Sequence, residues 1–71
     1  MKLYLQDRKA LLELPADIWI TEVCDRGLIV SNNRVRPYIA EYASVARAQE
    51  VVREIHEYYR DGKNSYTLPL E

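Results

Sequence analysis

Residues 45–60 predict an amphipathic helix, and a single such helix limits what the rest of the chain can fold into. At about 100° per residue, its apolar side chains fall within about 120° of arc. They are Ala48, Val51, Val52, Ile55, Tyr58 and Tyr59. Ser44 is the expected N-cap and Gly62 the expected C-terminal stop. Because the helix can bury only this stripe, the remaining segments must form the surface that covers it.

The N-terminal segment alternates in polarity. Residues 2–6 alternate apolar and polar side chains, and residues 9–14 do the same after a polar turn at residues 6–9, except that Leu11 stands on the polar side. Two alternating runs around a short turn predict a β-hairpin. A helix through residues 8–14 is the alternative, because Leu, Glu and Ala favour helix.

Three segments in the middle of the chain, residues 17–23, 28–30 and 37–42, predict further strands. The first is rich in β-branched and aromatic residues. The second is apolar without alternation, which is typical of a central strand covered on both faces. Side chains expected to share a face are Ile18 with Ile20, Trp19 with Thr21 and Val23, and Tyr38 with Ala40 and Tyr42.

Turns are expected between these strands. Residues 24–27 predict one turn, in which Gly27 would adopt a positive φ. The asparagines within residues 31–34 favour another turn, because Asn tolerates the left-handed region. After the helix, residues 66–68 predict a last short strand that ends at a proline.

Together these elements predict an α+β fold. We expect a single antiparallel sheet of five to six short strands with one amphipathic helix packed on one face. Residues 1–71 contain no repeat or linker-like stretch, so they are expected to form a single domain. One helix covers only part of such a sheet, and the tyrosines and tryptophan on the other face would stay exposed unless a second copy covered them.

The short chain also predicts self-association. For 71 residues, the free energy gained by apolar burial roughly equals the conformational entropy lost on folding. Chains of this size often gain stability from a disulfide, a metal or an oligomer. One cysteine and one histidine exclude an internal disulfide and a four-ligand Cys/His zinc site. We therefore expect a homo-oligomer with no metal and no cofactor.

Charge and hydropathy exclude several classes of protein. The net charge is −1, whereas proteins that grip a nucleic-acid backbone carry clusters of Lys and Arg. Nucleic acid is therefore not an expected partner. No apolar run reaches the roughly 18 residues of a membrane span, so no membrane partner is expected. The N-terminus becomes polar too early for a secretion signal, and a cytoplasmic location follows.

Few residues could carry catalysis. Cys24 and His56 are the only thiol and the only imidazole, and a semi-buried thiol and an imidazole on a helix flank explain both. The acidic residues fall mostly in turns or on the polar helix face, except Glu41, which suits an edge charge within its strand. Neither glycine stands directly before the helix, which excludes a phosphate-binding loop. We therefore expect a protein that is not an enzyme.

Two polar turns carry side chains suited to ligand binding. The first combines amides, guanidinium groups and a phenol, and its residues are Asn32, Asn33, Arg34, Arg36 and Tyr38. Arginine binds phosphate or carboxylate through two parallel hydrogen bonds, and a tyrosine ring can stack on a base. The second turn follows the helix and contains Lys63, Asn64 and Tyr66. Ordinary solvated turns are the alternative for both, and tyrosines also suit protein interfaces.

Five stretches of the chain resemble a known group of proteins. They are Leu5-Gln6-Asp7, Leu14-Pro15, residues 40–44, residues 47–52 and residues 66–69. The group consists of small uncharacterised proteins of Gram-positive bacteria, their phages and mobile elements. In that group a QDG-type hairpin opens the chain, an EYxSxERA motif starts the helix and a YxMP-like sequence ends it. Arg8 stands where the group usually has Gly, so a longer turn is expected there.

The resemblance implies a setting in which small non-enzymatic proteins act against host defence. The leading hypothesis is an oligomer that sequesters a phosphate-bearing nucleotide immune signal, such as a cyclic nucleotide or a cyclic ADP-ribose-type ligand. Arg34 and Arg36 would contact phosphate, and Tyr38 or Tyr66 would stack on the base. The alternative is a protein-interaction module that inhibits a host or defence protein through its aromatic sheet face.

Overall fold

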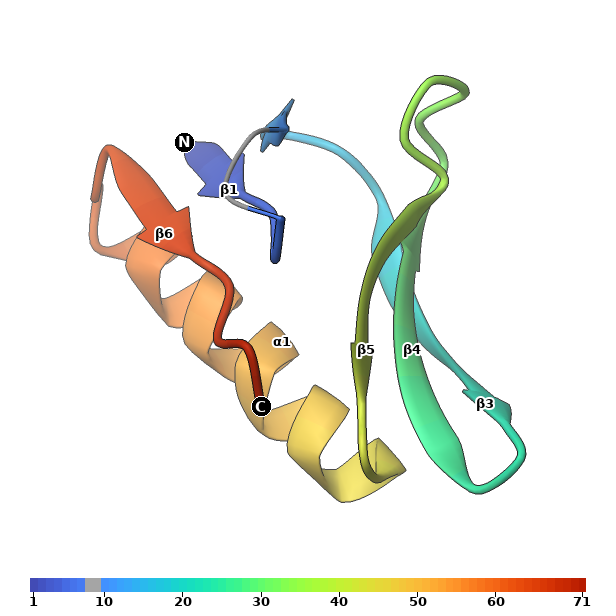
Figure 1. Ribbon diagram of the computed structural model, residues 1–71. Coiled ribbons are helices and arrows are strands. Elements are labelled where there is room, and N and C mark those ends of the chain that lie inside the picture. Colours follow the sequence, from blue (N-terminus) through green and yellow to red (C-terminus); the bar gives the residue numbers. More distant parts are fainter. Residues whose placement is uncertain (8–9) are drawn as a thin grey trace.

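The computed structural model describes residues 1–7 and 10–71 and contains two small sheets and one helix (Figure 1). The elements in chain order are β1 (Lys2–Tyr4), β2 (Leu11–Glu13), β3 (Ile18–Val23), β4 (Arg26–Ser31), β5 (Tyr38–Tyr42), α1 (Val45–Arg60) and β6 (Ser65–Thr67). The expected α+β class is confirmed. The expected single antiparallel sheet is wrong, because the strands divide into two three-stranded sheets, ordered β2-β1-β6 and β3-β4-β5.

The first sheet joins the two ends of the chain. β1 pairs antiparallel with β2, which confirms the expected hairpin, and it pairs in parallel with β6. Leu3, Leu12 and Tyr66 lie side by side across the three strands and are buried. This buried row fixes the register of the sheet. The helix considered for residues 8–14 is wrong where the chain is described, since β2 occupies most of it. The turn expected at Arg8 lies outside the described residues.

Two residues connect β3 to β4. Cys24 and Asp25 have φ angles of 51° and 65°, the left-handed conformation that a tight hairpin turn requires at both positions. The expectation that Gly27 takes a positive φ in this turn is wrong, because Gly27 lies within β4. A Cβ atom at Gly27 would come within 2.6 Å of the Ser44 carbonyl oxygen. The absence of a side chain therefore lets the start of α1 approach the sheet.

A bulge redistributes the side chains of β5. Ala40 lies opposite Ile29 of β4, and the next β4 residue pairs with Tyr38, which leaves Ile39 as an extra residue on β5. Ala40 and Tyr42 are buried, whereas Tyr38 is 48% exposed. The expectation that Tyr38 shares a face with Ala40 and Tyr42 is therefore wrong, because the bulge turns Tyr38 to the opposite face.

The helix has the bounds that the sequence predicts. The Ser44 hydroxyl accepts a hydrogen bond from the Arg47 backbone N–H at 3.1 Å, and Gly62 follows the helix with a φ of 75°. Both expected ends are therefore confirmed. The buried helix residues are Ala48, Val51 and Ile55. The stripe is narrower than expected, because two of its members are 37% and 45% exposed, namely Tyr58 and Tyr59.

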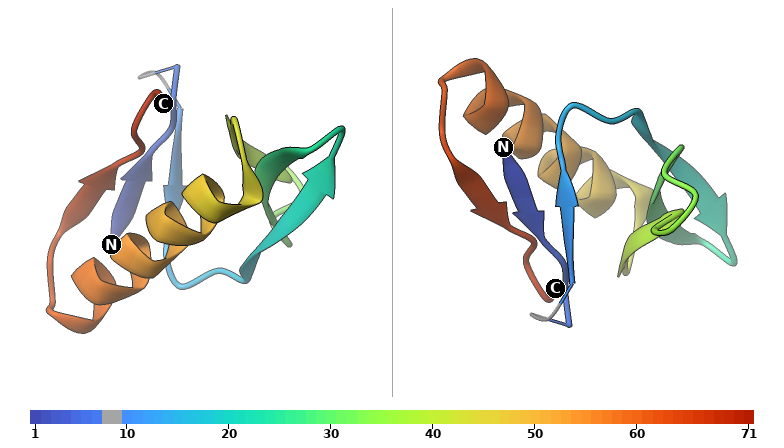
Figure 2. Two further views of the ribbon diagram at one scale, coloured as in Figure 1. Left: turned by 90° about the horizontal axis from the view of Figure 1, so that it is seen from below. Right: turned by 90° about the horizontal axis from the view of Figure 1, so that it is seen from above.

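α1 packs against β6 of the first sheet and against all three strands of the second (Figure 2). It covers only one face of the β3-β4-β5 sheet, and the core lies between the helix and the two sheets. Both sheets contribute buried apolar side chains, including Leu3, Leu12, Ile29 and Tyr42. Over the residues that the structure describes, no helix is long and apolar enough to cross a membrane.

One polar side chain ties the two sheets together. Gln6 follows β1, and its Oε1 accepts a hydrogen bond from the backbone N–H of Glu41 on β5 at 3.2 Å. Its Nε2 donates to the carbonyl of Pro69 at 3.0 Å, and the Tyr42 hydroxyl donates to the same carbonyl at 2.8 Å. These contacts hold the C-terminal segment against the edge of β5.

Candidate functional site

The face of the β3-β4-β5 sheet that points away from α1 is left open by the residues that the structure describes. We call it the open face, and its apolar side chains are Trp19, Val23, Leu28, Val30 and Tyr38. Trp19 and Tyr38 are each 48% exposed and Val23 is 49% exposed, while Leu28 and Val30 are half-buried. The expectation that residues 28–30 are covered on both faces is therefore wrong.

A polar cluster borders the open face. Arg26 forms an ion pair with Glu41, and the Tyr38 hydroxyl donates a hydrogen bond to Glu41 at 3.2 Å. Partial burial, followed by the neighbouring Glu41 carboxylate, raises the pKa of the Tyr38 phenol above its ordinary value. Tyr38 therefore stays neutral at physiological pH, and Glu41 holds its ring against the sheet.

The amides of the β4–β5 loop are used within the loop. The Asn33 side-chain oxygen accepts hydrogen bonds from the backbone N–H groups of Val35 and Arg36, at 2.8 and 2.9 Å. The Asn32 side chain accepts from the Asp17 backbone N–H and donates to the Asp17 carboxylate, both at 3.2 Å. Asn33 therefore shapes the loop in the manner of an Asx turn, whereas Asn32 ties the start of the loop to Asp17.

The two arginines of this loop differ from its amides. Arg34 and Arg36 are exposed, and neither guanidinium group forms an ion pair with the described residues. Arg36 and Tyr38 line one cleft of about 320 Å³, together with Gln6 and Asp7. The structure thus brings together two of the predicted ligand-binding residues beside the start of the chain.

The second predicted turn lies elsewhere. Lys63 and Asn64 line a separate cleft of about 460 Å³ beside Lys2 and Glu13 of the first sheet. Figure 1 and both views of Figure 2 place this turn, after α1, far from the β4–β5 loop. One copy of the chain therefore does not join the two turns into a single site.

Tyr66 does not belong to an exposed turn, because it lies in β6 and is only 4% exposed. Its ring packs edge-on against Tyr58 at a centroid distance of 4.9 Å. The hydroxyl has no partner in ordinary hydrogen-bond geometry among the described residues. Burial, followed by the nearby Glu54 carboxylate, raises the pKa of this phenol. Tyr66 is a core residue and cannot stack on a ligand in this structure.

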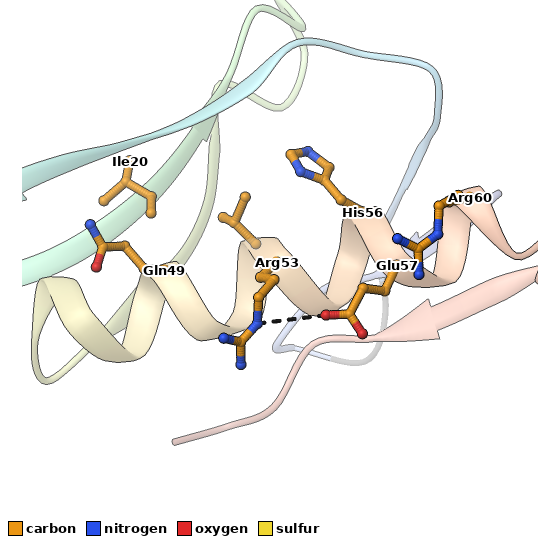
Figure 3. A pocket seen from close by; sticks show the side chains of 7 residues that line it. Ile20, Gln49, Arg53, His56, Glu57 and Arg60 are labelled. Carbon is orange, nitrogen blue, oxygen red and sulfur yellow. Dashed lines mark ion pairs between the residues drawn. The ribbon is translucent and has the colours of Figure 1, made fainter.

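A groove runs between α1 and β3, which is the outer strand of its sheet (Figure 3). Its volume is about 880 Å³, and Ile20 reaches from β3 toward Gln49 on the helix. Its polar lining on α1 includes Arg53, His56, Glu57 and Arg60. Arg53 and Glu57, four residues apart on the helix, form an ion pair at 3.6 Å. A smaller apolar cleft of about 170 Å³ continues past His56 toward Ile18.

Sequence reasoning missed the roles of Gln6, Gly27 and this groove. Each depends on which strands lie at a sheet edge, and local alternation carries no signal for that. Cys24, expected to be semi-buried, is exposed at the tip of the β3–β4 turn. Among residues 1–7 and 10–71, no group of three or more His, Cys, Asp and Glu side chains is placed to hold a metal ion.

The chain was compared with protein families, curated proteins and solved structures. No family model, no curated protein and no solved structure matches the chain.

Proposed function

We propose that this chain is a small binding module without catalytic activity, which docks on a protein partner through the open face. The observation that carries the proposal is that Trp19, Val23 and Tyr38 share one uncovered sheet face and are each about half exposed. Large apolar side chains gathered on an exposed surface are typical of interaction sites. Trp and Tyr also dominate the binding energy of protein interfaces.

The charges around the open face specify the partner's chemistry. Arg26 is balanced by Glu41, whereas Arg34 and Arg36 at the β4–β5 end have no acidic partner in the described part of the chain. A complementary surface therefore combines an apolar patch with carboxylates at one end. In the expected setting, that partner is a host or defence protein, which the module inhibits in the cytoplasm.

The test substitutes two aromatic residues of the open face and leaves the core residues unchanged. Trp19→Ser with Tyr38→Ser truncates two half-exposed side chains, and Tyr4→Ser on the first sheet, where Tyr4 is 38% exposed, is the matched control. A partner captured from host lysate is purified and titrated directly. Because interface aromatics contribute about 2 kcal/mol or more each, the double substitution should weaken binding at least about a hundredfold.

Arg36→Glu provides a second measurement, because it changes the charge beside the apolar patch without altering the patch. It should slow association and reduce the salt dependence of the rate. A partner that binds the Trp19/Tyr38 double variant as tightly as the wild-type chain contradicts the proposal.

Sequestration of a phosphate-bearing nucleotide is the second candidate, and the cleft shared by Arg36 and Tyr38 favours it. The volume of about 320 Å³ is at the small end of ligand pockets. Arg36 would bind phosphate, and Tyr38 would stack on the base. Three predicted residues are not part of this site. Tyr66 is buried, Asn33 bonds the backbone of its own loop, and Asn32 bonds Asp17.

Isothermal titration calorimetry with cyclic nucleotides and cyclic ADP-ribose isomers tests this second function. Arg36→Ala should weaken binding more than about tenfold, since a hydrogen bond to a charged group contributes about 1.5–3 kcal/mol. Lys63→Ala is the control, because Lys63 lines a different cleft. Absence of heat with every nucleotide removes this candidate.

Self-association belongs to the same proposal. A chain of 71 residues with an uncovered sheet face has much to gain from burying more surface. The resemblance to small phage and mobile-element proteins supports either function as an activity against host defence.

A further inference from the structure

The two sheets have four outer strands, and three of them are protected against pairing with another chain. β2 and β6 are only three residues long, and short edge strands offer few free backbone groups. β5 carries a bulge at Ile39 and follows Pro37. The Gln6 side chain also bonds both the N–H and the carbonyl of Glu41, at 3.2 and 3.4 Å. The edge of β5 is therefore blocked.

β3 has none of these protections. It spans six residues, Ile18–Val23, with no bulge in its pairing to β4 and no proline or lysine. Both views of Figure 2 place it at the margin of the molecule. A long, regular edge strand, in which four of six residues are apolar and the single charge is Glu22, is a template for pairing with another strand.

The register of β3 identifies which backbone groups are free. The Asn32 N–H donates to the Asp17 carbonyl at 3.0 Å, so these residues form a hydrogen-bonded pair across the two strands. Hydrogen-bonded and non-hydrogen-bonded pairs alternate along an antiparallel ladder. The backbone groups of residues 19, 21 and 23 therefore point to β4, and those of Ile18, Ile20 and Glu22 point away from it.

We propose that the free edge of β3 pairs antiparallel with β3 of a second copy, with the two-fold axis at Thr21. The inference rests on the self-association proposed above. It joins the two β3-β4-β5 sheets into one sheet of six strands. In this register Trp19 of each copy lies opposite Val23 of the other, and the two Thr21 residues lie opposite each other. Aromatic with β-branched pairs and Thr–Thr pairs are both favourable across strands.

The groove beside β3 supplies charge complementarity for this pairing. With the axis at Thr21, Glu22 of the second copy lies opposite Ile20 and faces the groove. The charged side chains that line the groove are Arg53, Arg60 and Glu57, and Arg60 also forms an ion pair with Asp61 just outside it. Glu22 is exposed and forms no ion pair within its own copy, over the residues described. The partner therefore brings a carboxylate to two arginines whose own ion pairs, with Glu57 and Asp61, are exposed to solvent and weak.

The helices leave room for the second copy. α1 packs against all three strands of its sheet, so each helix is centred near its own β4. In the joined sheet the two β4 strands are three strand spacings apart, about 14 Å. A helix with its side chains is about 10 Å wide, so both helices fit on the same face. A single unprotected edge per chain also closes the assembly at two copies.

Cross-linking tests the register directly. Across a non-hydrogen-bonded antiparallel pair the Cα atoms are about 4.5 Å apart, within the range that a disulfide spans. Thr21→Cys in a Cys24→Ser background should therefore form a covalent dimer on mild oxidation. Val23→Cys in the same background is the matched control. Its two copies would lie four residues out of register, about 14 Å apart, and should not cross-link.

Sedimentation equilibrium over a broad range of concentration tests the interface without a cross-link. The wild-type chain should pass from 8.4 kDa to twice that mass. Glu22→Arg should raise the dimer dissociation constant at least about tenfold, because it places a cation in a groove lined by arginines. Glu13→Arg, on β2, should leave the constant unchanged.

The outcomes separate this interface from self-association in general. A wild-type protein that remains at 8.4 kDa at every concentration overturns both. A dimer that is insensitive to Glu22→Arg and is not captured through residue 21 overturns the β3 interface alone. Cross-linking through residue 23 in preference to residue 21 also overturns it. Capture through residue 21 together with dissociation by Glu22→Arg supports it.

Discussion

Substitution of Gly27 by alanine should destabilise the packing of the helix against the sheet that it covers. An added Cβ atom would lie 2.6 Å from the Ser44 carbonyl oxygen, 2.9 Å from the Val45 Cα atom and 2.9 Å from the Ala48 Cβ atom. Carbon atoms in contact are ordinarily about 3.5–4.0 Å apart. Two of the three neighbours are backbone atoms at the start of α1, and Ala48 is fully buried. None can move without shifting the helix.

The change in the free energy of unfolding caused by Gly27→Ala results from two opposing effects. Extra carbon in a packed core costs about 1–3 kcal/mol, and the three simultaneous contacts place Gly27→Ala toward the upper part of that range. Replacing glycine within a strand returns about 0.5–1 kcal/mol of backbone entropy. The net loss in the free energy of unfolding should be about 2 kcal/mol. For a domain of this size, that lowers the melting temperature by about 8–16 °C.

Urea denaturation followed by circular dichroism measures the loss. Gly62→Ala is the control, because Gly62 has a φ of 75° and nothing within 4 Å of the added carbon; its cost should be only about 1 kcal/mol. Adding Ala48→Gly to Gly27→Ala removes one of the three contacts and should show favourable coupling in a double-mutant cycle. If Gly27→Ala proves no more destabilising than Gly62→Ala, the close approach of α1 does not explain the glycine.

Three further substitutions test other parts of the structure. Cys24→Asn with Asp25→Gly should raise the free energy of unfolding by about 1 kcal/mol in urea titrations, because both positions have positive φ. Gln6→Leu should lower it by about 1–3 kcal/mol by removing the bonds to Glu41 and Pro69, and carboxypeptidase should then remove the C-terminal segment faster. Tyr66→Phe should raise stability by about 1 kcal/mol at neutral pH, since the buried hydroxyl has no partner in ordinary hydrogen-bond geometry among residues 1–7 and 10–71. The raised pKa of Tyr66 means that wild-type stability is full below pH 10 and falls as pH rises past 10.0, the ordinary phenol value; the alkaline loss should be smaller in Tyr66→Phe.

The sequence predicts the elements of this fold better than their arrangement. The helix, its caps and the first hairpin carry local signals, such as the apolar stripe and Ser44, and all are confirmed. The pairing of β1 with β6 has no such signal, because the two strands come from opposite ends of the chain and run parallel. Because this pairing could not be predicted, all strands were expected to lie in one sheet, whereas the structure has two.

Prediction of the candidate site was limited for the same reason, because pairing between distant strands has no local signal. The exposure of Trp19 follows from its place in the alternation of β3 and was correctly expected. Tyr38 reaches the same face only because of the bulge at Ile39, and Tyr66 is buried because β6 enters the first sheet. Residue type predicted which side chains could bind a ligand, but their exposure depends on pairing between distant strands.

The proposed interactions reinforce each other through the geometry of β3. The open face and the free edge share this strand, so pairing two copies by their edges leaves both open faces on the same side of the joined sheet. With the two-fold axis at Thr21, the two copies of Trp19 lie two residues from the axis on opposite sides, and the loops that carry Arg34 and Arg36 lie farther out, also on opposite sides. A partner for such a dimer needs a long apolar surface with carboxylates at both ends, whereas a single copy needs them at one. Weakening the dimer by Glu22→Arg should therefore also weaken partner binding, although Glu22 points away from the open face.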